Sequence, residues 1–161
     1  MFVGINPHPG SYRRGIPFSN NKMFWYLLNR SGIIDEDIED LRNDKSLMRL
    51  YKDRFANVYN LNFTNIITRP SHDVSQLKRG EENSGRRRIL RLISTNKPRV
   101  VCFIGKVTYS KFVGHNDFDF GWQNDICGSK AYVMHFPIRG RAEVRVRELK
   151  EVSGVAMNAR R

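Results

Sequence analysis

The stretch RVVCFIGKVTYSKFV, residues 99–113, is the clearest structural signal in the sequence. Its first part is a continuous, largely β-branched apolar run, which is typical of a strand buried on both faces of a sheet. Gly105 ends this run, and a helix is expected to begin there and to cover 106–113. A strand that leads through a glycine into a helix is typical of α/β folds.

Similar strand and helix patterns alternate along the rest of the chain. Further strands are expected over 2–5, within 57–70, and over 118–123 and 131–136. Further helices are expected over 22–29, 37–51 and 81–95, followed by a last helix with Ala142, Val146, Leu149 and Val152 along one stripe. The alternation predicts one domain, residues 1–161, folded as a three-layer α/β/α sandwich with a mostly parallel sheet. Residues 153–161 are expected to form a frayed tail.

The end of the first strand carries an unusual polar segment. The apolar run 1–5 changes within one residue to the sequence Asn6, Pro7, His8, Pro9, Gly10. The loop that this segment opens reaches about Asn21, which is too long for a plain connection. In parallel α/β sheets, the loops at the carboxyl ends of the strands form the ligand crevice. We therefore expect the functional site among the loops after Ile5, Phe63 and Phe136.

The composition indicates a polyanionic partner. The chain has 28 Lys and Arg against 16 Asp and Glu, which gives a formal net charge of +12. Because these basic residues are spread through the sequence, they are expected to make a basic surface that attracts nucleic acid. The alternative is a basic soluble protein without such a partner.

Missing motifs disfavour several classes of enzyme. We find no phosphate-binding loop, no dinucleotide fingerprint and no evident Ser-His-Asp or Cys-His constellation. Two cysteines, Cys102 and Cys127, and four scattered histidines do not have the spacing of a zinc site or a disulfide framework. Neither a membrane span nor a signal peptide is apparent, so an intracellular protein is expected. Chemistry in the crevice is then left to amides, aromatic rings and positive charge.

Several blocks of the sequence, in the right order, resemble the mismatch-specific uracil/thymine-DNA glycosylases, a branch of the uracil-DNA glycosylase superfamily. These blocks are GINP (4–7), GIPF (15–18), FW (24–25), FTNIITRP (63–70) and KPRVVCFIGKVTYSKF (97–112), and together they span most of the chain. The resemblance implies a uracil-DNA glycosylase-like fold. It also implies a monofunctional DNA glycosylase that flips uracil opposite guanine out of the duplex and hydrolyses its N-glycosidic bond, with thymine and modified cytosines as further substrates.

The resemblance assigns the catalytic position to Asn6. In the family, this asparagine helps to position the water that attacks the deoxyribose C1′. An amide can fix a water with one donor and one acceptor, but it cannot act as a general base at neutral pH. Without the resemblance, Asn6 would be interpreted as a residue that caps the strand or forms an Asx-turn.

The resemblance also places a base pocket around the first two loops. Phe18 matches the aromatic residue on which the flipped base stacks, and Asn65 matches a residue that contacts the edge of the base. Ile5, His8 and Ser11 fall where relatives line the pocket, although His8 replaces the usual glycine. The alternatives are ordinary core packing for Phe18 and a turn for Asn65.

The segment HFPIRGR, residues 135–141, corresponds to the loop that enters the DNA stack. Arg139 is the expected wedge, with Ile138 and Arg141 as alternatives. We assign His135 and Arg145 to the same DNA-binding set, with Arg145 as a phosphate contact. Each arginine has the alternative of a solvated surface charge.

The sequence thus predicts a monomeric base-excision enzyme that acts on double-stranded DNA carrying a mismatched or damaged base. It is expected to need no metal or organic cofactor and to work with DNA, in the nucleus of a eukaryote or the nucleoid of a bacterium. One alternative is a catalytically silent DNA-binding module on the same scaffold. Another, a hydrolase of free nucleosides, is disfavoured because a small neutral substrate does not need so strong a positive field.

Overall fold

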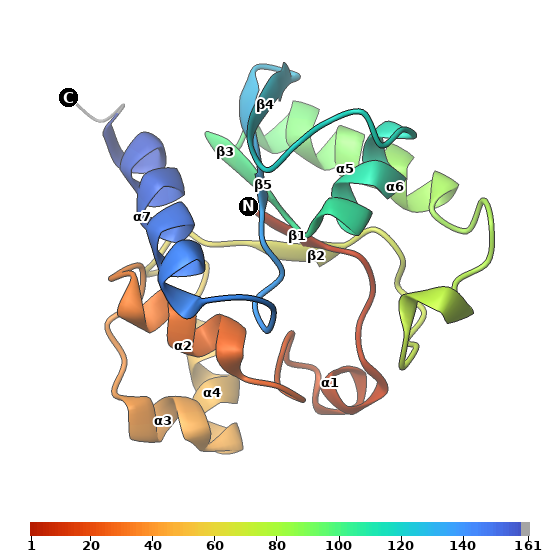
Figure 1. Ribbon diagram of the computed structural model, residues 1–161. Helices are drawn as coiled ribbons and strands as arrows, with labels where there is room; N and C mark the ends of the chain where they lie inside the picture. Colours follow the sequence, from red (N-terminus) through yellow and green to blue (C-terminus); the bar gives the residue numbers. More distant parts are fainter. Residues whose placement is uncertain (159–161) are drawn as a thin grey trace.

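Strand β3 (Val100–Ile104) lies at the centre of a five-stranded sheet in the computed structural model, which describes residues 1–158 (Figure 1). Strands β1 (Phe2–Gly4) and β5 (Ser129–Met134) pair with it in parallel on either side. Strand β2 (Phe63–Asn65) extends the sheet in parallel beyond β1, and β4 (Gly121–Ile126) adds an antiparallel edge beyond β5. The predicted mostly parallel sheet is confirmed.

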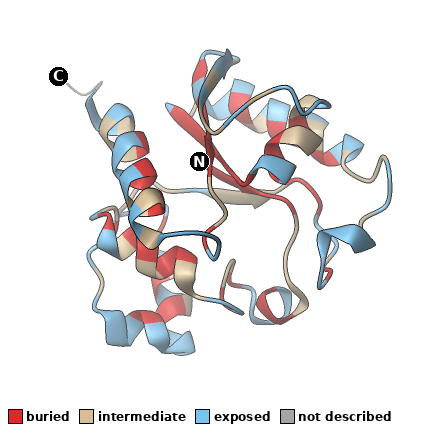
Figure 2. Ribbon diagram, viewed as in Figure 1, coloured by how far each residue is buried: buried red, intermediate tan, exposed pale blue. Residues whose placement is uncertain are grey.

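Side chains of β3 alternate between two apolar layers, because successive residues of a strand point to opposite faces. Val100, Cys102 and Ile104 pack with α2 (Met23–Arg30) and α7 (Ala142–Asn158). Val101 and Phe103 pack with α5 (Asn83–Asn96) and α6 (Lys106–Val113). The two helical layers lie on opposite sides of the buried sheet (Figures 1 and 2). This arrangement confirms the three-layer sandwich.

The polar helix predicted over 37–51 is interrupted at Asn43. Helix α3 (Ile38–Arg42) ends there, α4 (Asp44–Arg49) begins, and a π-helical turn, η1 (Leu50–Arg54), continues it. Asn43 has an extended backbone, and its Oδ1 accepts hydrogen bonds of 3.0 Å from the amides of Lys45 and Ser46. The prediction of one continuous helix is wrong because Asn43 caps the second helix.

A short helix, α1 (Pro9–Arg14), lies within the long loop that follows β1. His8 is its N-cap, because the His8 Nδ1 accepts a hydrogen bond from the Gly10 amide at 3.1 Å. Pro9 stands at the first helical position, which suits proline because no backbone donor is needed there. Gly15, with φ of 69°, ends the helix. The otherwise unusual His8-Pro9 pair therefore begins a helix at the carboxyl edge of the sheet.

Other boundaries also differ from those predicted. Strand β2 covers only part of 57–70, β4 begins three residues after the predicted 118, and a 3₁₀ turn, η2 (Val74–Gln76), follows β2. Helix α7 continues through 153–158, where fraying was expected; residues 159–161 of that predicted tail lie outside the described residues. The Arg99 Nη1 donates to the Ala156 carbonyl at 2.9 Å and thereby holds the last turns of α7. No helix within 1–158 is long and apolar enough to cross a membrane.

Gly85 allows α5 to pack directly against the segment that follows β2. An ideal Cβ at residue 85 would lie 1.7 Å from the carbonyl oxygen of Ile66. One turn further along α5, the Arg88 guanidinium donates to Thr64 Oγ1 at 2.8 Å and to the Asn65 carbonyl. These contacts fix the carboxyl end of β2.

We expect Gly85→Ala to lower the free energy of unfolding by about 2–3 kcal/mol, because the new methyl group must displace backbone. Gly154→Ala is the matched control: its Cβ would meet nothing within 4 Å, and alanine is favoured over glycine inside a helix by about 0.5–1 kcal/mol. Urea unfolding monitored by tryptophan fluorescence measures both changes. Equal stability of the two variants would contradict the close approach of α5 to Ile66.

Candidate active site

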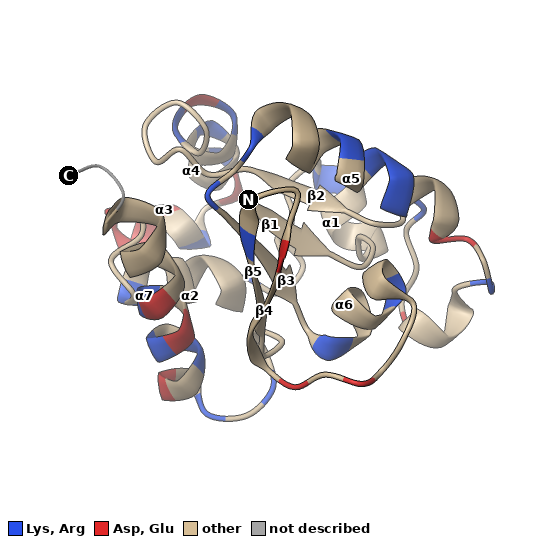
Figure 3. Cartoon of the chain, turned by 90° about the horizontal axis from the view of Figure 1, so that it is seen from above, with Lys and Arg blue, Asp and Glu red and all other residues tan. Residues whose placement is uncertain are grey.

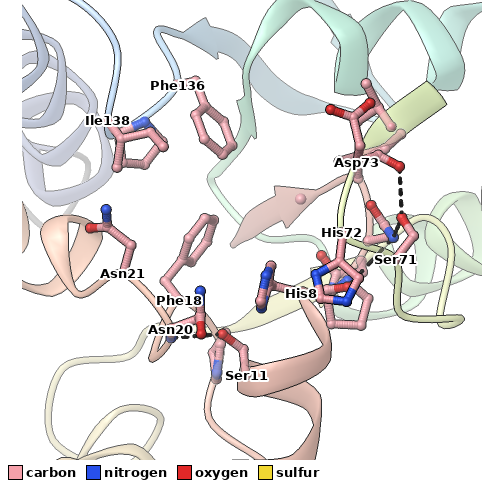
Figure 4. A pocket seen from close by; sticks show the side chains of 18 of the residues that line it. His8, Ser11, Phe18, Asn20, Asn21, Ser71, His72, Asp73, Phe136 and Ile138 are labelled. Atoms are coloured by element: carbon pink, nitrogen blue, oxygen red, sulfur yellow. Dashed lines mark hydrogen bonds between the residues drawn. The ribbon is translucent and has the colours of Figure 1, made fainter. Parts of the chain in front are cut away.

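A cavity of about 280 Å³ opens at the carboxyl ends of β1, β2 and β5, and we call it the edge pocket (Figure 4). This volume lies near the lower limit for small-molecule sites, which suits a single small ring. All three loops that the sequence indicated contribute to its wall. The lining residues used below are Ile5, Asn6, His8, Ser11, Phe18, Phe63, Asn65, Ser71, His72, Asp73, Val74, Phe136, Pro137 and Ile138.

Backbone hydrogen bonds hold the first two loops against each other. The amides of Ile66 and Ile67 donate to the carbonyls of Gly4 and Ile5 at 2.9 and 2.8 Å, and the Ser71 amide donates to Pro7 at 3.1 Å. The pairing of β1 and β2 therefore continues beyond the strands themselves. It brings residues about 65 positions apart in the sequence to one side of the edge pocket.

The amide group of Asn6 is held by the second loop. Its Nδ2 donates to Ser71 Oγ at 2.7 Å and to the Arg69 carbonyl at 3.1 Å. Ser71 Oγ in turn donates to the Asp73 carbonyl at 3.0 Å. Because the carbonyls of Arg69 and Asp73 can only accept, this chain of bonds orients the amide with its nitrogen toward the second loop.

The Asn6 Oδ1 has no hydrogen-bond partner among residues 1–158, so one acceptor of a fixed amide is left for a small donor such as water. Asn6 is half-buried, and it directly follows the buried β1 and Ile5. Movement of this oxygen would require the bonds from Nδ2 to Ser71 and Arg69 to break. The position expected to be catalytic is thus a rigid acceptor at the edge pocket.

Phe18 forms an aromatic wall of the edge pocket. Its ring lies 4.7 Å from the Phe24 ring, 5.5 Å from Phe63 and 6.3 Å from Phe136, measured between centroids. Its φ of 55° is unusual for a bulky residue and costs free energy that the surrounding packing must supply. Figure 4 shows Phe18 and Phe136 together across the cavity from Ser71 and His72. Phe18 is therefore both packed against the core and exposed to the cavity.

Asn65, the last residue of β2, offers the second amide of the site. Its side chain occupies the space above Gly4, where a Cβ would lie 2.5 Å from Asn65 Oδ1. The side-chain amide has no hydrogen-bond partner within 1–158, whereas its backbone carbonyl is held by Arg88. Ser11 is buried, and its Oγ accepts from the Asn20 amide at 2.9 Å, which braces the first loop. Asn65 is thus the better placed of the two polar groups to bind a ligand.

His8 and His72 lie edge to face at the pocket, with ring centroids 5.0 Å apart. Burial lowers the pKa of His8, and the charges of His72, Arg13 and Arg14 lower it further. The neutral imidazole has one acceptor, and the bond from Gly10 requires that this acceptor be Nδ1. The proton of His8 is therefore on Nε2, which makes this nitrogen a donor without a partner in 1–158.

The third loop, which follows β5, contributes apolar side chains to the edge pocket and carries two exposed arginines beside it. Phe136, Pro137 and Ile138 line the edge pocket, and the Ile138 side chain is about half exposed (51%). Arg139 and Arg141 are exposed beside the pocket but do not line it. Of the candidates for a wedge, only Ile138 reaches the cavity among the described residues.

Two residues of the expected DNA-binding set, Arg145 and His135, make their contacts within the protein. Arg145 is only 4% exposed, and its guanidinium donates to the carbonyls of Phe136, Arg139 and Gly140. The Arg145 side chain is buried under the loop, away from solvent, so we do not retain it as a phosphate contact in the proposal below. His135 does not line the pocket either; its ring stacks on Phe120 at 3.5 Å and its Nδ1 bonds Glu148 at 2.9 Å.

Sequence reasoning missed the side chains that follow β2. Ser71, His72, Asp73 and Val74 all line the edge pocket. The available signal was their position, directly after Arg69-Pro70 at the carboxyl end of a strand. Asp73 is the one acidic residue in the lining within 1–158; the hydrogen bonds from Ser75 lower its pKa, and Arg139 lowers it further. Asp73 is accordingly ionised at neutral pH.

Basic residues gather on two elements of the molecule (Figure 3). Figure 3 shows basic residues along α5 and on the segment that joins β5 to α7. Arg87 and Arg91 of α5 are exposed, whereas Arg88 is half-buried against β2, so only part of the arginine cluster faces solvent.

Residues 1–158 contain no cluster of three or more His, Cys, Asp or Glu that would hold a metal ion. The site offers amides, rings and one carboxylate.

Comparison with known proteins identifies the family of this chain. A model of the family described as the uracil DNA glycosylase superfamily matches residues 1–155. The chain is 28% identical over 152 residues to the G/U mismatch-specific uracil DNA glycosylase of Schizosaccharomyces pombe, and the match covers 88% of this chain but 44% of the yeast protein. The chain thus spans less than half of that relative's length. Because the family match extends over almost all of the chain, the resemblance seen in the sequence blocks is confirmed, and the protein belongs to the uracil DNA glycosylase superfamily.

Proposed function

We propose that this protein is a monofunctional DNA glycosylase that hydrolyses the N-glycosidic bond of a uracil opposite guanine. The observation that carries the proposal is the Asn6 amide, fixed by Ser71 and Arg69 with Oδ1 free at a cavity of about 280 Å³. The name of the yeast relative and the net charge of +12 support a DNA substrate. Thymine and modified cytosines opposite guanine are further candidate substrates.

Asn6 acts by holding the attacking water. Oδ1 accepts a hydrogen bond from the water and thereby directs a lone pair of the water oxygen toward C1′ of the flipped nucleotide. As the C1′–O bond forms, the C1′–N bond breaks, and the proton of the water passes to solvent. An amide does not take the proton, so the acceleration comes from position and electrostatics, and the base must leave as a stabilised anion. The bonds to the second loop favour this mechanism, because they remove the rotation that would present Nδ2 to the water.

The base itself stacks on Phe18 and is recognised at its polar edge. Asn65 offers a donor and an acceptor, and the His8 Nε2 proton suits a carbonyl oxygen such as those of uracil. Ser11 and Ile5 complete the wall. A mispaired base costs less to extrude than a paired one, which supplies part of the selectivity before the pocket is reached.

Ile138 is our choice for the group that enters the DNA stack. It is apolar, half exposed and next to the cavity, and apolar wedges fill the space that a flipped base leaves. Arg139 and Arg141 follow it in the exposed part of the same loop, and we propose that they meet phosphates. We propose that the protein works as a monomer, without metal or organic cofactor, in the compartment that holds the cell's DNA.

The parent protein is expected to generate an alkali-labile abasic site in a duplex with one G·U pair, and Asn6→Ala to lower the single-turnover rate by 10²-fold or more, about 3 kcal/mol. Denaturing electrophoresis after alkali treatment measures both. Asp73→Asn is the matched control and should keep most of the activity. If Asp73→Asn is as inactive as Asn6→Ala, a carboxylate base drives the reaction instead. Binding of the G·U duplex without cleavage by the parent would indicate a silent DNA-binding module.

Ser71→Ala should reduce the single-turnover rate by roughly tenfold, because one of the bonds that orient the Asn6 amide is lost. Ser71→Thr retains the hydroxyl and should keep most of the rate. Rates measured with saturating enzyme separate this effect from DNA affinity. A rate for Ser71→Ala equal to that of the parent would show that the Arg69 carbonyl alone orients the amide.

Replacing Phe18 by leucine keeps an apolar side chain but removes the stacking face. We expect kcat/KM to fall by about 10- to 100-fold, since stacking of a base on an aromatic ring contributes about 1–3 kcal/mol. Phe112→Leu, in the core on the opposite face of the sheet, controls for loss of stability. Similar kcat/KM values for the two variants would argue against a stacking role.

A further inference from the structure

The loop between β5 and α7, residues 135–141, is held from beneath by two buried charged residues of α7. Arg145 and Glu148 are 4% and 6% exposed, and they lie three residues apart on the helix. No ion pair of 4 Å or less joins them or pairs Arg145 with an acidic group within 1–158. Burial of a charge is costly unless it is well compensated, so the compensation must come from another source.

The backbone of the loop provides that compensation for Arg145. Its Nη1 donates to the carbonyls of Phe136, at 3.3 Å, and Arg139, and its Nη2 donates to Gly140 at 3.1 Å. The buried Nε has no partner among the described residues. All the observed hydrogen bonds of this guanidinium therefore go to one short loop, on the side opposite to solvent.

Glu148 holds the start of the same loop. Its carboxylate accepts from the His135 amide at 3.2 and 3.3 Å, and its Oε1 bonds the His135 Nδ1 at 2.9 Å. One face of the His135 ring is covered by Phe120, and the Lys106 ammonium lies 4.6 Å from the centre of the Phe120 ring. Residue 135 is thus fixed at both its backbone and its side chain.

Neither Arg145 nor Glu148 lines the edge pocket. The loop residues that they hold in place, Phe136 to Ile138, do line it. We propose that Arg145 and Glu148 are positioning residues that hold the 135–141 loop in the shape required for Ile138 to enter the DNA stack before any DNA is bound. The inference rests on the proposed glycosylase function. A preformed loop lowers the entropy that must be lost on binding, and the benefit applies to a duplex, in which a base has to be replaced, more than to a single strand.

The first test of this proposal is limited proteolysis, which does not depend on enzymatic activity. Arg139 and Arg141 are exposed trypsin sites within the loop, and Arg79 is a reference site in another exposed segment. We expect Arg145→Met to raise cleavage after Arg139 and Arg141 by about tenfold relative to cleavage after Arg79, because the loop carbonyls lose their donors. The control is Arg42→Met, which removes an exposed arginine whose guanidinium, among residues 1–158, hydrogen-bonds and pairs with Glu39 alone. An unchanged ratio of cleavage would overturn the proposal.

The second test asks whether the held loop serves the reaction. Uracil release is compared between a G·U duplex and the same uracil strand alone, and the ratio of the two rates is independent of the folded fraction. Arg145→Met should lower this ratio by about tenfold, with the single-strand rate within about twofold of the parent's. Ile138→Ala should lower it similarly. Loss of both rates in equal proportion would mean a merely structural role and would overturn the proposal.

Glu148→Ala is the second variant, in case Arg145→Met fails to fold, and it should change both readouts in the same direction. A drop in the ratio for Ile138→Ala but not for either α7 variant would show that Ile138 acts without support from α7. If the parent releases no uracil from either DNA, the proposed function is wrong, while the protease test still decides whether Arg145 and Glu148 hold the loop.

Discussion

The site depends on the parallel pairing of β1 with β2, which continues beyond the ends of both strands. The bonds from Ile66, Ile67 and Ser71 to the carbonyls of Gly4, Ile5 and Pro7 make the two loops behave as an extension of the sheet. Side chains on such a segment inherit the rigidity of the sheet, which free loops do not have. Asn6 can therefore be oriented by Ser71 and Arg69 although about 65 residues separate them in the chain.

Rigidity of this kind matters because the chemistry available to an amide is limited. An asparagine amide has no proton to give or take at neutral pH, so under the proposed mechanism any acceleration by Asn6 would come from where it places a water. The backbone strain found in the site is consistent with a need for precise positioning. Phe18 adopts a left-handed backbone conformation that only dense packing with Phe24 and Phe63 would sustain. Such departures from local preference are expected where function, rather than stability, determines the residue.

Patterns of polarity predicted the parts of this molecule that depend on neighbours in sequence. The buried run 100–104 predicted the central strand, and the polar residue after an apolar strand drew attention to Asn6. Ser71 could not be identified in this way, because its importance comes from a contact with Asn6 across the sheet edge. His8 was unexplained because the capped helix that begins after it is short and has no apolar stripe. The burial of Arg145 could have been predicted from its position, because it lies four residues before Leu149 and thus on the buried stripe of α7. Its charge instead favoured the interpretation as a surface residue.

The two sides of the edge pocket are built by different physical means. Sheet-like backbone bonds hold the side that carries Asn6 and Asn65, whereas buried side-chain charges of α7 hold the side that carries Phe136 and Ile138. Phe18 is the link between them, since its ring lies within 6.3 Å of both Phe63 and Phe136. Sites that do not share partners respond independently to mutation. Under the proposed function, bond cleavage and duplex insertion would respond largely separately to mutation, and Phe18, which contacts both sides, would couple them.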